Sequence, residues 1–239
     1  MKRYVSVFEM IARSSIYKVL LVIVTMVVAE VVYLSYAFTS TQRVLMEVYI
    51  DERFFGTAFK VAYTLITLLL ILPGMNLGST QSYTLKRLRI KEKNIYWLQA
   101  VYNFLAFVIL WGVQLLVILG FMVFYQNHLP EGAVITNQTM FLAFYRVDFM
   151  HSILPLEDRT NWMMLFSIGA VTALAAAECT KLQRGGKFAF ELCVMVATTW
   201  IVFPRELGYD FSLWLIATGS VCVVMWIRWG LHRLEEGGV

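Results

Sequence analysis

Six apolar segments, each near the length that a helix needs to cross a bilayer, constrain this chain more than any other feature of its sequence. An α-helix needs about 20 mainly apolar residues to cross roughly 30 Å of hydrocarbon. Because backbone polar groups must be paired inside the bilayer, such runs predict helices rather than the short alternating strands of a barrel. The segments cover residues 17–38, 59–81, 96–125, 161–180, 188–204 and 211–231.

The composition agrees with a membrane location. Hydrophobic residues make up 59% of the chain, whereas soluble domains are about 45–50% apolar. The net charge of +4 is divided among short connectors, which argues against a nucleic-acid partner. We expect one all-α integral membrane domain covering residues 1–239, with six transmembrane helices.

The positions of Lys and Arg predict the orientation. In the six-helix arrangement, fourteen of the twenty basic residues fall on one side and six on the other. Cytoplasmic connectors are enriched in Lys and Arg, so we expect the basic side, with both termini, to be cytoplasmic. We expect a multi-pass protein of a bacterial inner (plasma) membrane.

Residues 1–15 are amphipathic. Apolar side chains recur at spacings of three and four, while Lys2, Glu9 and Arg13 lie on the opposite face. We expect an N-terminal interfacial helix that lies along the cytoplasmic membrane surface before the first span. The alternative is a straight extension of that span into water.

A basic connector joins the second and third segments. Residues 83–94 hold five of the twenty Lys and Arg residues. One interpretation is topology plus attraction to anionic membrane lipid, worth about 1 kcal/mol per residue. The other is a short helix over 83–95 that docks into a groove on a soluble partner, because Leu85, Leu88 and Glu92 follow spacings of three and four.

The longest external connector covers residues 126–160. Within it, residues 139–154 are apolar apart from a few hydroxyls and Arg146, Asp148 and His151. The stretch is short for a span and interrupted at its middle, so we expect an interfacial or re-entrant helix rather than a seventh span.

Glu30 is the only acid inside the first apolar segment. An acid at membrane depth costs about 2.5–3.5 kcal/mol on insertion scales and is normally kept only facing protein or water. One interpretation is a carboxylate that lines a cavity or couples to an ion. The other is a structural hydrogen bond to a neighbouring span, with Gln114 as the candidate partner.

Small residues suggest bending and close packing. Pro73 and Gly74 can bend the second segment and act as a hinge, and the spacing of Gly74 and Gly78 lets another backbone approach. The same spacing recurs in the fourth segment, at Gly169, Ala173 and Ala177. Both patterns suit either packing inside the bundle or a subunit interface.

No catalytic, metal-binding or nucleotide-binding pattern is recognisable, so we expect no enzyme activity and no cofactor in this chain. Gly185, Gly186 and Lys187 are not part of a phosphate-binding loop, because position 181 is Lys instead of the first glycine and Phe188 replaces the hydroxyl. Glu178 and Glu191 lie near basic residues at the interface, which favours local neutralisation over a proton pathway. The histidines and cysteines are scattered: His128, His151, His232, Cys179, Cys193 and Cys222.

The layout resembles the membrane subunit of ABC type 2 exporters, permeases that pair with separate ATPase subunits. The resemblance covers the whole chain and is most specific at residues 78–95, which are similar to the family's connector between spans two and three, where a coupling helix docks into the ATPase. It implies a role in coupling for Leu85, Lys86, Leu88, Arg89, Lys91 and Glu92. Members often place re-entrant helices between spans five and six, for which residues 204–210 are too short.

The resemblance implies a subunit of an ATP-driven exporter of hydrophobic or amphipathic cargo, such as a peptide, antibiotic or lipid. Its partners would be cytoplasmic ABC ATPases, which bind ATP and Mg, and a second permease subunit, identical or related. The alternatives are a non-transporting membrane scaffold, such as an immunity or sensor component, and an intramembrane enzyme that uses Glu30 and one of the other acids.

Overall fold

The computed structural model of the chain describes residues 2–40, 49–50, 52–75, 92–128, 137–156, 159–183, 187, 189–203 and 210–237. Within these ranges all regular structure is helical, which confirms the predicted all-α class. The helices are α1 (Lys2–Ser40), α2 (Glu52–Met75), α4 (Glu92–Asn127), α5 (Asn137–Arg146), α6 (Asp148–Ile153), α7 (Arg159–Gln183), α8 (Phe190–Val202) and α9 (Asp210–Gly237).

Five helices of the described part, α1, α2, α4, α7 and α9, are long and apolar enough to cross a membrane. They match five of the six predicted spans. The exception is the segment at 188–204, because α8 has only 13 residues and is about 20 Å long at 1.5 Å per residue. Phe203 ends α8 in an extended conformation, with φ −108° and ψ 133°, as a following proline favours. Helix length therefore supports five spans rather than six.

The N-terminal residues do not form a helix separate from the first span, which corrects that part of the prediction for 1–15; their position at the membrane surface stays a prediction. α1 runs without a break through 39 residues, as in the straight-extension alternative. α4 covers part of the apolar face of its first turns: the ring of Phe8 meets that of Tyr102 edge-on at 6.0 Å, and the Ser15 hydroxyl donates to the Tyr102 hydroxyl at 2.9 Å. Tyr4 and Val5 of the same face are 46% and 65% exposed, so part of the face is still available to a membrane surface.

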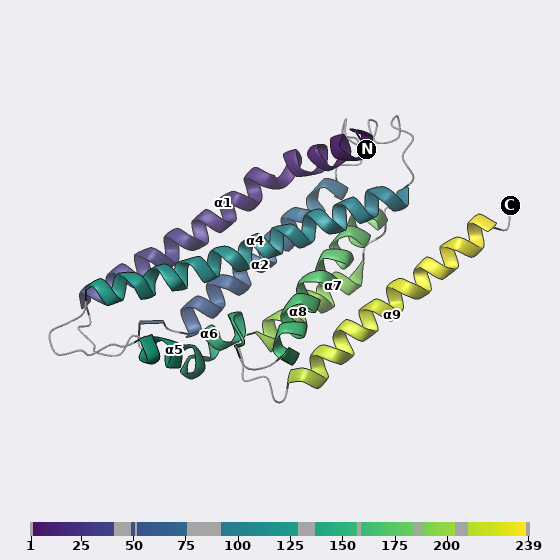
Figure 1. Cartoon of the computed structure of the whole chain (residues 1–239). Coiled ribbons are helices and arrows are strands. Elements are labelled where there is room, and N and C mark those ends of the chain that lie inside the picture. The colour runs from purple at the N-terminus through teal and green to yellow at the C-terminus, as the bar shows by residue number, and fades with distance from the viewer. Residues whose placement is uncertain are drawn as a thin grey trace.

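α1 and α4 run parallel and lie side by side along most of their length (Figure 1). At one end the Asn94 amide donates to the Tyr4 hydroxyl at 3.2 Å, and at the other the rings of Phe38 and Phe124 are 5.5 Å apart. α4 has 36 residues, hence a length of about 54 Å, and extends well beyond roughly 30 Å of hydrocarbon. It also packs against α2 and α7, and because it lies between three other long helices we call it the central helix.

The segment that the sequence predicts to be external forms two short helices in its described part, as expected for a stretch that does not span. α5 and α6 are separated at Val147, which is extended. Phe149 and Ile153 of α6 are fully buried, and the Trp111 indole donates to the Ile153 carbonyl at 2.9 Å. α6 therefore closes the end of the bundle remote from the chain termini (Figure 1).

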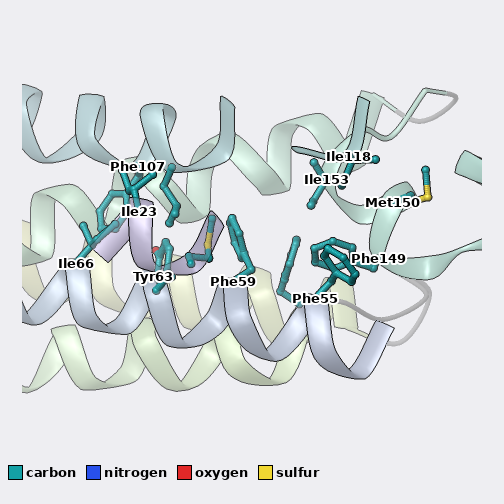
Figure 2. Close-up of a cluster of buried hydrophobic side chains, with 14 of the residues drawn as sticks. Ile23, Phe55, Phe59, Tyr63, Ile66, Phe107, Ile118, Phe149, Met150 and Ile153 are labelled. Carbon is teal, nitrogen blue, oxygen red and sulfur yellow. The ribbon is translucent and has the colours of Figure 1, made fainter. Parts of the chain in front are cut away.

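The largest apolar core is built around the aromatic side chains of α2. Figure 2 shows Phe55, Phe59 and Tyr63 in succession along this helix. The Tyr63 ring lies 4.7 Å from that of Phe107 on α4, and the Phe55 ring lies 5.9 Å from that of Phe149 on α6. α2 therefore joins the central helix to the closed end of the bundle.

Candidate functional site

The first turns of α4 lie where several helix ends meet, and we call this region the basic end. It comprises Tyr4 of α1, residues 92–99 of α4, Thr180 of α7, Glu191 of α8 and residues 228–229 of α9. The rings of Tyr96 and Trp229 are 6.2 Å apart, and the Gln99 amide donates to the Thr180 hydroxyl at 3.0 Å. Both chain termini lie toward this end in Figure 1.

The predicted coupling segment leads directly into the basic end. Glu92 is the first residue of α4 and is exposed. Lys93 places its ammonium 5.3 Å from the centre of the Trp229 ring, which links the end of the connector to α9. The other predicted coupling residues lie outside the described residues: Leu85, Lys86, Leu88, Arg89 and Lys91.

α4 carries three buried amide side chains that bond to two different helices. Gln99 and Asn103 face α7, where the Asn103 amide donates to the Ala173 carbonyl at 3.2 Å. Gln114 faces α1 and donates to Glu30. The sequence analysis found only Gln114. The signal for Gln99 and Asn103 was their spacing of four residues within an apolar run, since residues at this spacing share a helix face.

Glu30 and Gln114 form the interhelical hydrogen bond that the sequence suggested. The Gln114 amide nitrogen donates to Glu30 Oε2 at 3.1 Å, and both residues are 0% exposed. Glu30 has no ion pair with any described cation. The second carboxyl oxygen of Glu30 and the amide oxygen of Gln114 have no hydrogen-bond partner among the described residues. These two oxygens are the least satisfied polar atoms of the α1–α4 contact.

The small residues of α7 face α4, so within this chain they serve close helix packing. Ala173 and Ala177 are buried, and a Cβ added at Gly169 would lie 3.8 Å from the Phe104 ring. This arrangement favours the packing interpretation over the subunit interface. Pro73 and Gly74 fall in the last turn of α2, where a hinge remains a prediction, and Gly78 lies outside the described residues.

An ion pair joins α8 to α9 at the basic end. Arg228 donates through Nη2 to Glu191 Oε1, and the two side chains are 35% and 9% exposed. The sequence analysis predicted local neutralisation of Glu191 by basic residues nearby in the chain. The structure instead supplies the charge from Arg228, which is 37 positions away in sequence.

Further hydrogen bonds between helices hold the rest of the bundle together. The Tyr63 hydroxyl of α2 donates to Thr172 of α7 at 2.7 Å, and the Trp214 indole of α9 donates to Ser167 of α7 at 3.0 Å. Bonds of this kind are worth about 0.6 kcal/mol on average in a membrane. The described residues contain no group of three or more His, Cys, Asp or Glu side chains arranged to hold a metal ion.

Comparisons with protein-family models, with curated proteins and with solved structures found no match. The site is therefore defined by its own geometry: a basic end that receives the connector, and a central helix whose buried amides bond to α7 and α1.

Proposed function

We propose that this chain is the membrane-spanning subunit of an ATP-driven exporter that resembles the ABC type 2 class. Cytoplasmic ATPase subunits, which bind ATP and Mg, would dock on the 83–95 coupling segment. The main support is that this segment continues directly into α4, the helix that packs against α1, α2 and α7. A movement imposed on the connector would act first on a helix that contacts three other long helices of the bundle.

The length of α4 suits the transmission of such a movement. Its 36 residues are one uninterrupted helix. Asn103 bonds to α7, Gln114 bonds to α1, and at the far end the Phe121 ring lies 6.1 Å from that of Tyr49. A tilt of α4 would therefore change contacts at both ends, as an exchange between inward-open and outward-open packings requires.

The proposal includes six passages of the chain between the two ends of the bundle, with both termini cytoplasmic. Five of these passages are helices long enough to span a membrane, and we propose that the shorter α8 provides the sixth. Its Glu191 pairs with Arg228 at the basic end, whereas Phe203, just beyond its other end, lies 6.0 Å from Phe149 of α6. The short α8 thus runs from the basic end toward the closed end.

A second permease subunit is part of the proposal, because ATPase subunits of this class work in pairs. Within the apolar window of α9 only 17% of the residues are buried, compared with 56% for α7. α9 therefore offers apolar surface to lipid or to another subunit. We propose, as the resemblance implies, that the exported cargo is hydrophobic or amphipathic.

Affinity purification of the tagged protein from its native membrane tests the proposal. An ATPase should co-purify with the wild type and be lost when Leu88 and Arg89 are both replaced by alanine. Lys187→Ala is the matched control, because it removes an exposed charge from another connector on the same predicted side. Purification without any ATPase, or equal recovery of the ATPase with the wild type and with both variants, would contradict the proposal. A stable partner that binds no nucleotide would favour the scaffold alternative.

A further inference from the structure

The contact between Glu30 and Gln114 contains more acceptors than donors. Both side chains are fully buried beside the largest apolar cluster, to which α1, α2, α4, α6, α7 and α8 contribute. One hydrogen bond joins them, from Gln114 Nε2 to Glu30 Oε2. Glu30 Oε1 and Gln114 Oε1 both lack a partner among the described residues. A buried acceptor without a donor carries an uncompensated desolvation cost.

A single hydrogen atom placed on the Glu30 carboxyl would satisfy both oxygens. A carboxylic acid has one O–H donor and one carbonyl acceptor, and a primary amide has a complementary N–H donor and carbonyl acceptor. The acid O–H would donate to Gln114 Oε1 while the existing bond from Gln114 Nε2 stays in place. An ionised carboxylate has no donor and would leave both oxygens unpaired.

We propose that Glu30 is a proton-binding site, and that its neutral carboxylic acid forms a two-bond pair with the Gln114 amide that joins α1 to α4. The ligand is one proton, taken up from water by the carboxylate with no other change in bonding. Loss of that proton would remove one of the two bonds and leave a negative charge in an apolar core.

Other titratable groups on the helices packed against Glu30 have partners elsewhere. On α2, the Lys60 ammonium lies 5.9 Å from the centre of the Trp200 ring, and the Tyr63 hydroxyl bonds to Thr172. Several other groups also contact other residues: Tyr33 stacks on Phe54, Tyr102 accepts from Ser15, Tyr125 packs on Tyr49, and Lys93 lies over Trp229. On α1 itself the nearest basic residue is Lys18, which is about 18 Å from Glu30 along the helix. No described cation pairs with Glu30.

The inference does not depend on the transport proposal. It concerns the chemical state of one contact between two helices of this chain. A proton lost or gained there would change how tightly α1 is held to the central helix, whatever the protein does.

Infrared spectroscopy of the full-length protein in lipid, near neutral pH, tests the inference. The difference between the wild type and Glu30→Gln should contain the carbonyl band of a protonated carboxylic acid, present only in the wild type. Glu9→Gln, which removes an exposed acid from the same helix, is the matched control and should leave this band unchanged. A difference spectrum that shows only carboxylate bands would overturn the proposal.

The pairing with Gln114 has its own test, which does not require the Glu30 variant to fold. In the wild type, isotope-labelled glutamate should shift the acid band to lower frequency, which assigns the band to a glutamate. Gln114→Leu should move the band to higher frequency, because the carbonyl loses its hydrogen bond. An acid band whose frequency is unchanged by both the isotope label and Gln114→Leu would overturn the proposed pair.

Discussion

Removing Arg228 should weaken the attachment of α9 to the rest of the bundle. The ion pair with Glu191 is a charged contact among those that hold this helix, most of whose apolar window is exposed in this chain. An exposed ion pair contributes about 0.2–1 kcal/mol, and breaking a fully buried one costs about 3–5 kcal/mol. Glu191 is 9% exposed and Arg228 is 35% exposed, so the pair lies between these limits. We expect Arg228→Met to lower the free energy of unfolding by about 2 kcal/mol.

A double-mutant cycle separates the charge interaction from packing. Glu191→Gln combined with Arg228→Met removes both charges, so the carboxylate is no longer left without its partner. The double variant should be more stable than the Arg228→Met single variant. Unfolding of the purified protein in mixed detergent micelles, followed by tryptophan fluorescence, provides the free energies. Lys187→Met removes an exposed basic residue of the same side and should change stability by less than about 0.5 kcal/mol.

Two results would refute this reasoning. If Arg228→Met were as stable as Lys187→Met, the ion pair would contribute nothing to the attachment of α9. If the double variant lost the sum of the two single losses, the two charges would not interact, and the contact seen between α8 and α9 would not exist in the membrane.

Three further predictions concern the core and the topology. Phe149→Ala should lower the free energy of unfolding by about 3 kcal/mol, because it leaves a cavity under α6. A loss below about 1 kcal/mol in the same micelle assay would mean that α6 is not packed tightly against the end of the bundle. Tyr63→Phe removes the bond to Thr172 and should cost only about 0.6 kcal/mol; a loss well above the largest value of about 1.7 kcal/mol would show a larger role for this hydroxyl. A membrane-impermeant thiol reagent should label Glu92→Cys only from the cytoplasmic side and Gln138→Cys only from the outside. Labelling of both variants from the same side would contradict the proposed topology.

Much of the fold could be predicted from the sequence because the length of an apolar run is a local property. Five of the six predicted spans are long apolar helices. The segment at 188–204 holds only the shorter apolar helix α8, and Pro204, which limits the conformation of the residue before it, is the local signal that this helix ends early. The second helix begins at Glu52 rather than near residue 59, because its first turn is polar and a hydropathy pattern does not include it.

Side-chain pairing could be predicted only where few partners were available. Glu30 and Gln114 are isolated polar residues inside apolar runs, so each was the natural partner of the other, and the structure joins them. The partner of Glu191 depends on how α9 packs, and several bases lay nearer in sequence than Arg228. The amphipathic face of residues 1–15 posed a different problem, because an apolar stripe looks the same whether lipid or another helix covers it.

ATP hydrolysis by the purified membrane complex tests the central claim most directly. The proposal predicts that a complex isolated through the tagged chain hydrolyses ATP in lipid, and that replacing both Leu88 and Arg89 by alanine abolishes this activity while the variant protein stays folded in the membrane. Two results would contradict the claim that this chain is driven through its basic connector. One is ATP hydrolysis that the double replacement leaves unchanged, and the other is a folded wild-type protein that purifies without any ATP hydrolysis.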